Sequence, residues 1–233
     1  MIAAAGVLVA VIVTGLAASA VAERASTLGK TKRTPKPACS GQQGACFITG
    51  QVTGFQRSVD GKANLFKAKR NGRIVAWSID MGRPAKKDRE AFGEAGGTDE
   101  FGGSPTAGIG ILRKKGGGEY KLLRSSPILK VQSFYGQQPT FTLRDPLRIR
   151  KGNIVALTTA TWLPTFAVQN QGRDDVWVGS RNKKNCDIDD QGLDYFFRHT
   201  RPHRKVGSVR KYKCAYREAR LLYWAYLAPR GGN

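Results

Sequence analysis

From Cys46 onward the chain alternates between short runs of β-branched and aromatic residues and turns rich in glycine, proline, asparagine and aspartate. Between Val75 and Met81 every second side chain is large and apolar, and this period of two is typical of a strand with one buried face. About nine or ten such runs follow one another at spacings of roughly 8–15 residues. The pattern predicts an all-β fold, an antiparallel β-sandwich of jelly-roll-like kind.

Three segments add detail to this expectation. Residues 154–162 are β-branched and apolar on both faces, which predicts a strand in the middle of a sheet. Gly108 and Gly110 lie on the same face of a predicted strand, which indicates that another backbone approaches closely there. One short helix is expected near residues 84–92, because Pro84 suits a first helical turn and good helix formers follow it.

The first 22 residues carry no charged side chain and end in two overlapping Ala-x-Ala triplets, 18–20 and 20–22. An apolar stretch that closes on small residues is typical of an export signal with its cleavage site. The basic residues expected at the start of such a signal are missing, and an uncharged run of this length could also remain as a membrane anchor. We predict that residues 1–22 are a cleaved signal peptide and that the protein is secreted or extracytoplasmic, with an uncleaved anchor as the alternative.

The chain that follows divides into two parts. Residues 23–38 are polar and basic and include two prolines, which predicts a flexible linker. Hydrophobic residues make up 40% of the chain and aromatic residues 9%, enough for a packed core. Residues 39–233 are therefore expected to form a single β-sandwich domain.

The chain contains four cysteines, and an even number in an exported protein favours two disulfides. Three pairings are possible, of which we favour Cys39–Cys46 and Cys186–Cys214. The second bond would close a loop of about 28 residues and stabilise the fold by roughly 3 kcal/mol. Metal binding by the cysteines is disfavoured, because no Cys-x2-Cys pair occurs.

Lysine and arginine outnumber aspartate and glutamate by 39 to 17, which gives a formal net charge of +22. Such a field attracts polyanions, and those outside a bacterial-type cell are wall teichoic polymers, acidic glycans, anionic lipid headgroups and extracellular DNA. The densest basic run is 197–213, in which aromatic residues lie among the cations. The predicted polyanion-binding residues are Arg198, Arg201, Arg204, Lys205, Arg210, Lys211 and Lys213. The alternative is a solvated strand pair without a ligand, and no specific nucleic-acid recognition is expected.

An acidic stretch offers a calcium loop as a further candidate site. Asp187, Asp189 and Gln191, followed by a glycine, place oxygen ligands at alternate positions, and Asp194 could add one more. The twelfth position is Arg198 where a calcium loop of the EF-hand type has a bidentate glutamate. The alternative is an acidic surface turn that balances nearby lysines, and no other cofactor is expected.

Four tryptophans raise the possibility that aromatic rings stack on sugars. Trp77 and Trp162 lie within apolar strands and are expected in the core. Trp177 follows two aspartates and is the tryptophan expected to be exposed, and Tyr223 alternates with its aromatic neighbours in the last strand. The sequence therefore offers Trp177 and Tyr223 as candidate residues of a carbohydrate-binding module.

Catalytic motifs such as Gly-x-Ser-x-Gly and His-Glu-x-x-His do not occur. The two histidines, His199 and His203, are separated by Pro202 and have no adjacent carboxylate, so we interpret them as part of an exposed basic loop rather than as an acid–base or metal pair. A glycan hydrolase is the less favoured alternative, and it would need two carboxylates facing one cleft.

Four segments, 72–82, 125–131, 139–168 and 219–227, resemble a group of uncharacterised exported β-sandwich proteins of high-GC Gram-positive bacteria. The shared motifs are structural, and one is the Trp-x-Pro exit at 162–164, so the resemblance implies fold and compartment but no catalytic residues. We therefore expect an exported, non-catalytic β-sandwich protein that associates with anionic envelope or extracellular polymers.

Overall fold

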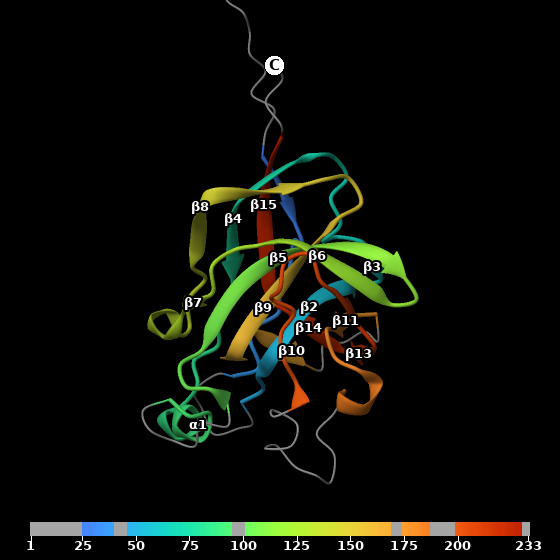
Figure 1. The fold of residues 1–233 in the computed structure, drawn as a ribbon. Coiled ribbons are helices and arrows are strands. Elements are labelled where there is room, and N and C mark those ends of the chain that lie inside the picture. Colours follow the sequence, from blue (N-terminus) through green and yellow to red (C-terminus); the bar gives the residue numbers. More distant parts are fainter. Residues whose placement is uncertain (1–24, 40–45, 95–100, 169–173, 187–198, 230–233) are drawn as a thin grey trace, which may run out of the picture.

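The computed structural model describes residues 25–39, 46–94, 101–168, 174–186 and 199–229. Over these residues it confirms the all-β, antiparallel, sandwich-like architecture, with one short helix among the described elements (Figure 1). The strands are β1 Ser26–Leu28, β2 Thr49–Val59, β3 Lys62–Ala63, β4 Gly72–Ile79, β5 Thr106–Gly116, β6 Glu119–Ser125, β7 Leu129–Lys130, β8 Thr140–Ile149, β9 Ile154–Leu163, β10 Phe166–Val168, β11 Val176–Gly179, β12 Val209–Lys211, β13 Cys214–Arg217, β14 Ala219–Leu221 and β15 Tyr223–Pro229. The helix is α1, Lys86–Ala91, and short 3-10 turns occur at Gln132–Phe134 and Lys183–Asn185.

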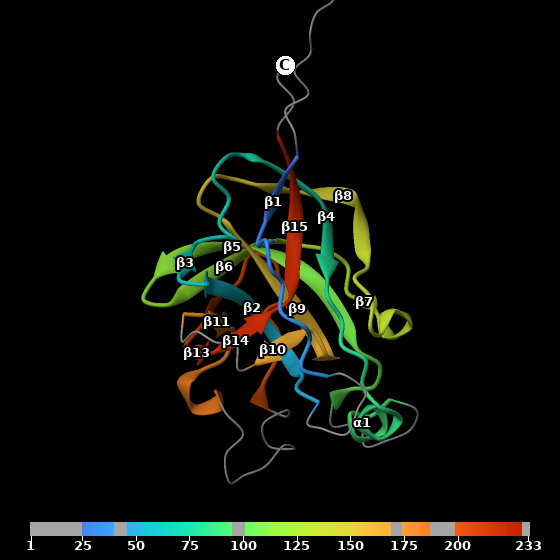
Figure 2. The same cartoon turned by 180° about the vertical axis from the view of Figure 1, so that it is seen from behind.

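The strands form two main sheets of unequal size. The larger sheet has nine strands and follows the order β12-β6-β5-β9-β2-β11-β13, with β3 and β7 paired beside this path. The smaller sheet has the order β1-β15-β4-β8, and β10 pairs with β14 in a separate ribbon. In Figures 1 and 2 the smaller sheet occupies the upper part of the molecule and the larger sheet curls below it, so that the two enclose the core.

The prediction that residues 154–162 form a strand in the middle of a sheet is confirmed by β9. β9 lies between β5 and β2, and every side chain from Ile154 to Thr159 is buried. The two glycines of β5 also behave as predicted, because a Cβ added to Gly108 would lie 2.8 Å from the carbonyl oxygen of Pro127. A Cβ added to Gly110 would lie 2.9 Å from a methyl group of Leu122.

The predicted alternation in β4 is broken at Val75. Relative to β15, β4 contains one extra residue between Ile74 and Ala76, which is a β-bulge. Val75, predicted to face the core, is consequently only half-buried, whereas Ile74 is completely buried with Trp77. The prediction of one buried face was therefore wrong at this position, since a bulge moves the following side chains to the other face.

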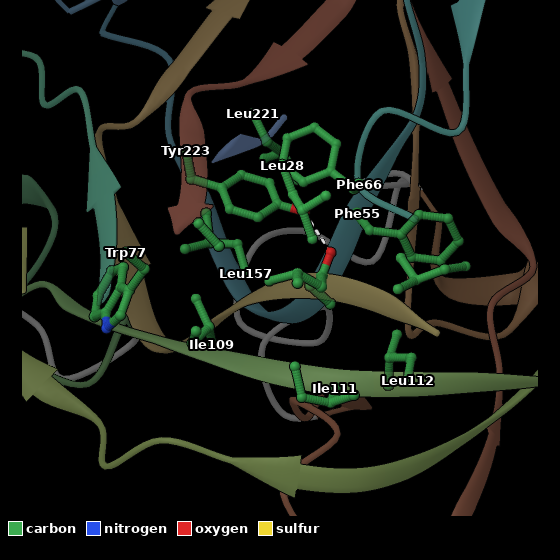
Figure 3. Packing of buried hydrophobic residues seen from close by; sticks show 14 of the residues in the cluster. Leu28, Phe55, Phe66, Trp77, Ile109, Ile111, Leu112, Leu157, Leu221 and Tyr223 are labelled. Carbon is green, nitrogen blue, oxygen red and sulfur yellow. Dashed lines mark hydrogen bonds between the residues drawn. The ribbon is translucent and has the colours of Figure 1, made fainter. Parts of the chain in front are cut away.

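One contiguous core joins the two sheets. Its members run from Leu28 near the start of the described chain to Leu227 near its end. Figure 3 shows Tyr223 of the smaller sheet between Phe66 and the β9 residues, with its ring 4.3 Å from that of Phe66. The Tyr223 hydroxyl donates a 2.9 Å hydrogen bond to the carbonyl oxygen of Val155, so its polar end is satisfied inside the core (Figure 3).

The N-terminal segment corrects a prediction. Residues 23–38 were expected to form a flexible linker, but β1 pairs with β15 and Leu28 is 7% exposed in the core. Thr31 accepts a hydrogen bond from Arg220, and Lys30 lies 5.0 Å from the centre of the Trp224 ring. A basic, proline-containing segment is expected to be a flexible linker only when no strand is available to pair with it. Here the edge of β15 pairs with the segment and orders it.

The helix and the disulfides agree with the predictions. α1 spans six residues, and Pro84 precedes its N-cap, Ala85, where the backbone N–H is held by the Asp88 carboxylate at 3.1 Å. Disulfides join Cys39 to Cys46 and Cys186 to Cys214, as favoured. Two disulfides indicate folding in an oxidising, extracytoplasmic environment.

Within the described ranges, the helix present is too short and too polar to cross a membrane. The predicted signal peptide, residues 1–22, lies outside the described residues.

Candidate anion-binding site

A basic pocket of about 410 Å³ lies between the end of β11 and the segment that leads into β12. Among the described residues, its lining contains four permanent cations and a histidine, together with hydroxyl and amide groups, and no aspartate or glutamate. The lining residues are Ser180, Arg181, Asn182, His199, Thr200, Arg201, Val209, Arg210 and Lys211. We call this the basic pocket.

Backbone pairing positions one wall of the basic pocket. β12 lies at the edge of the larger sheet, where Arg210 is paired with Tyr120 of β6. All three residues of β12 are exposed, so Arg210 and Lys211 present their charges to solvent. The Arg210 guanidinium donates a 2.7 Å hydrogen bond to the carbonyl oxygen of Arg201 and joins the strand to the preceding segment.

The opposite wall is held by Arg181, a residue that the sequence did not single out. Arg181 is 7% exposed, and its guanidinium donates hydrogen bonds to Tyr216 Oη at 2.8 Å and to the carbonyl oxygen of Gly50 at 2.5 Å. Its backbone carbonyl accepts a hydrogen bond of 3.0 Å from the N–H of Lys213. Nothing in the local sequence distinguishes Arg181, because its position depends on pairing with distant strands.

The Cys186–Cys214 disulfide anchors the same region. It links the turn after β11 to the start of β13, with the two Cα atoms 5.0 Å apart. Tyr216 Oη donates a 2.5 Å hydrogen bond to the carbonyl oxygen of Cys186 and also receives one from Arg181. The pocket wall is thus tied together covalently and by hydrogen bonds, which limits the side-chain entropy lost when a ligand binds.

Behind the pocket lies a buried imidazole. His203 is 1% exposed, which corrects its interpretation as part of an exposed loop. Its Nε2 lies 3.2 Å from the carbonyl oxygen of Ser208, and its Nδ1 lies 3.2 Å from the Tyr212 hydroxyl. Because a carbonyl only accepts, Nε2 carries the proton and Nδ1 accepts from Tyr212.

The environment of His203 keeps the ring neutral. Burial lowers the pKa of His203 from its ordinary 6.5 to about 4, and the nearby Arg210 guanidinium contributes to this lowering, whereas the hydrogen bond to Ser208 opposes it. Its backbone N–H donates to Thr53 Oγ1 at 3.0 Å, which fixes the segment against β2. His203 therefore supports the basic pocket structurally and adds no charge to it near neutral pH.

The structure brings part of the predicted polyanion-binding set together. Arg201, Arg210 and Lys211 line the pocket. Arg204, Lys205 and Lys213 are exposed but are not among the lining residues, and the Lys213 ammonium donates to the carbonyl oxygen of Gly117 at 3.0 Å. The remaining member, Arg198, lies outside the described residues.

The predicted carbohydrate-binding residues are not exposed. Trp177 is 3% exposed and Tyr223 is 1% exposed. Trp177 stacks on Tyr216, with ring centres 4.2 Å apart, and the edge of Phe166 covers it at 6.0 Å. The prediction was wrong because β11 is sandwiched between β2 and β13, a placement that its acidic flanking residues do not reveal. Trp77 and Trp162 are buried as expected.

The predicted calcium ligands Asp187, Asp189, Gln191 and Asp194 all lie outside the described residues. Among the residues that are described, no group of three or more histidine, cysteine, aspartate or glutamate side chains is arranged to hold a metal ion. The calcium loop therefore stays a prediction from the sequence.

Comparisons of the chain with protein-family models, with curated proteins and with solved structures each gave no match. The resemblance to exported β-sandwich proteins noted above therefore stays a prediction.

Proposed function

We propose that this protein is an exported, non-catalytic β-sandwich protein that binds an anionic polymer of the cell envelope or the extracellular space through the basic pocket. The observation that carries the proposal is the composition of the pocket, where Arg181, Arg201, Arg210 and Lys211 share one hollow and none of the described lining residues is a carboxylate. Arginine forks donate paired hydrogen bonds to phosphate and carboxylate groups. Hydroxyl and amide groups of Ser180, Thr200 and Asn182 supply further hydrogen bonds.

The electrostatics of the whole chain support the same proposal. The net charge of +22 draws any polyanion toward the surface before specific contacts form. The pocket then provides a place where several cations act on one segment of the polymer. Displacement of counterions gives such binding a steep dependence on salt.

The lining of the basic pocket does not favour the two alternative functions, carbohydrate binding and glycan hydrolysis. No aromatic ring is among its described lining residues, so these residues offer a neutral sugar no stacking platform. The described residues that line the three pockets include no pair of carboxylates of the kind that glycoside hydrolysis uses. These observations favour an anion-binding role for the pocket.

The test is retention of the full chain on a sulfated-polysaccharide resin and on isolated cell walls over a range of salt concentrations. We expect R210Q/K211Q to elute at clearly lower salt than the unmodified protein, because two exposed pocket cations are removed. The matched control is K86Q/K87Q, which removes the same charge from exposed positions on α1. Equal elution of the two variants, or retention that does not change with salt, would contradict the proposal.

The export step has its own test. We propose that cleavage follows the Ala-x-Ala triplets, which requires that protein recovered outside the cell begins close to Ala20 or Ala22. N-terminal sequencing of the recovered protein measures this directly. Residue 1 still attached to the recovered protein would support the anchor instead.

A further inference from the structure

A second basic hollow, distinct in its residues from the basic pocket, is lined by residues of β5, β6 and β8 and of the turn that leads from β8 into β9. Its volume is about 300 Å³. Three arginines from three strands and a fourth directly after β8 line it together with one apolar residue and one buried amide; these are Arg113, Arg124, Arg148, Arg150, Leu123 and Asn153. We call this the arginine groove.

Two of these arginines, Arg148 and Arg150, face solvent because the residues that alternate with them are buried. Leu147 and Ile149 of β8 are buried in the core, at 7% and 2% exposure. Because side chains alternate along a strand, Arg148 and Arg150 both face solvent on the same side. A smaller hollow of about 110 Å³ shares these two residues and adds Arg73, so the basic surface continues onto β4.

The strand register places like charges opposite one another at this groove. Arg73 of β4 is paired directly with Arg148 of β8, and Arg113 of β5 is paired directly with Lys121 of β6. Side chains in such positions start about 5 Å apart, and like charges there destabilise a sheet. These two pairs of like charges lie beside the same groove and lower the stability of the fold. An anion bound in the groove would remove this destabilisation.

Within the described part of the chain no ion pair offsets this repulsion, although the Arg124 guanidinium donates a 2.9 Å hydrogen bond to the carbonyl oxygen of Leu123. None of Arg113, Arg124, Arg148 and Arg150 forms an ion pair with a described carboxylate. Asn153 is 6% exposed and also lines the groove. The groove thus combines four guanidinium groups with one buried amide residue.

We propose that the arginine groove is a second anion-binding site and that its ligand is a phosphate group of a linear phosphate polymer. Guanidinium forks match the oxygen geometry of phosphate. A lipid headgroup fits less well, because the exposed large apolar residues, Phe47, Leu129, Val206 and Val209, do not line the groove. A nucleobase would use an aromatic platform, and no aromatic residue is among the described residues that line the groove.

Both basic sites lie beside β6, since β12 of the basic pocket pairs with β6 and the arginine groove contains two β6 residues. Arg210 of the basic pocket is paired with Tyr120, and Arg124 of the arginine groove lies four residues further along the same strand. Four residues of a strand span about 13 Å, so a polymer of a few phosphate units can contact both sites. This two-site part of the inference rests on the proposed function, whereas the arginine groove itself does not.

The experiment measures binding of the full chain to long-chain polyphosphate at several salt concentrations. We expect R148Q/R150Q to weaken binding about tenfold or more at low salt. It should also reduce the slope of log affinity against log salt by about 1.4–1.8, since each phosphate contact contributes about 0.7–0.9. The control K86Q/K87Q removes the same charge away from the groove and should change affinity by less than about twofold. If R148Q/R150Q binds like this control, the arginine groove is not an anion site.

The variants of the two sites separate the two proposals. If R210Q/K211Q alone weakens binding, the basic pocket stands and the arginine groove is excluded. If R148Q/R150Q alone weakens binding, the arginine groove stands and the basic pocket is excluded. Two further probes, hyaluronate and phosphatidylglycerol vesicles, test the source of the anion, and binding to either one as tight as to polyphosphate overturns the assignment to a phosphate polymer.

A thermal unfolding measurement without ligand distinguishes binding from a structural role. R148Q/R150Q removes one member of the Arg73–Arg148 repulsive pair, so its unfolding temperature should equal or exceed that of the unmodified protein. Polyphosphate should raise the unfolding temperature of the unmodified protein more than that of R148Q/R150Q. An unfolding temperature well below that of the unmodified protein would show that the arginines are structural and would overturn the inference.

Discussion

The phenol oxygen of Tyr212 lies 3.2 Å from Nδ1 of the buried His203, although Tyr212 belongs to a run of cations that looks entirely solvent-exposed in the sequence. The Tyr212 ring in turn packs on Tyr120 at 4.9 Å and on Phe55 at 6.1 Å. The basic run is therefore held to the larger sheet by a neutral histidine and a buried tyrosine. The exposed cations of this run therefore lie on a segment that these two buried residues attach to the sheet.

The first prediction concerns pH. The pKa of His203 is lowered to about 4 in the folded protein, so the folded state stays unprotonated while the unfolded state gains a proton below about 6.5. The contribution of His203 is fully present above pH 6.5 and is lost as pH falls from 6.5 toward 4, at no more than about 1.4 kcal/mol per pH unit. Urea denaturation at pH 7.5, 6, 5 and 4 measures the slope.

The control for this prediction is H203N, which keeps a polar amide but does not titrate. Carboxylates titrate in both proteins, so the difference between the two curves isolates the imidazole. We expect the variant to be less stable at pH 7.5 and to lose less stability on acidification. Parallel curves for the two proteins would show that His203 is not the group responsible.

The second prediction compares the two disulfides. Cys186–Cys214 closes a loop with a sequence separation of 28, whereas Cys39–Cys46 closes one of 7. The chain-entropy model assigns about 3.6 kcal/mol to the longer loop and about 2.4 kcal/mol to the shorter one. We expect C186A/C214A to lower the free energy of unfolding more than C39A/C46A, as measured by urea denaturation. The reverse order would indicate that local packing at Cys39, rather than loop closure, dominates.

The third prediction tests the correction at the N-terminal segment. Leu28 of β1 packs into the core, so L28A should lower the free energy of unfolding by about 2 kcal/mol or more. K32A, at an exposed position four residues further on, should change it by less than about 0.5 kcal/mol. Thermal or urea unfolding of the two variants provides the comparison. If L28A leaves the free energy of unfolding unchanged, residues 23–38 behave as a flexible linker and the correction is wrong.

The fourth prediction concerns the glycines of β5. A methyl group at Gly108 would meet the backbone carbonyl of Pro127, whereas one at Gly110 would meet the movable end of Leu122. Backbone yields less readily than a side chain, so G108A should destabilise the fold by about 1–3 kcal/mol and G110A by less. Urea denaturation of both variants measures the difference. Equal effects would mean that the 125–128 segment adjusts as easily as the leucine.

Several features could be read from the sequence because they depend on local pattern. The all-β class, the central position of β9 and the short helix near residues 84–92 follow from side-chain periodicity and turn residues. The choice of Cys39–Cys46 and Cys186–Cys214 follows from short separations along the chain. The basic character of the 197–213 run is a matter of composition alone.

Other features were misread because they depend on what distant segments cover. Trp177, expected on the surface, is buried by Tyr216 and Phe166, and Tyr223 is buried in the core. Val75 was assigned to the wrong face, because a bulge is defined only relative to the neighbouring strand. In each case the local pattern was compatible with both outcomes, and a non-local contact selected one.

The properties of the candidate sites can also be divided into those that the sequence sets and those that the tertiary structure sets. The sequence by itself determined that the chain is strongly basic and predicted that it folds as antiparallel β structure, since charge and periodicity are properties of the chain; it left three cysteine pairings possible, and the structure contains the favoured one. Only the tertiary structure decided that Arg181 shares a pocket with Arg210 and that Arg148 faces Arg73. The physical reason is strand register: which cations become neighbours depends on how strands far apart in the chain are hydrogen-bonded, and a shift of one residue would turn each of them to the opposite face.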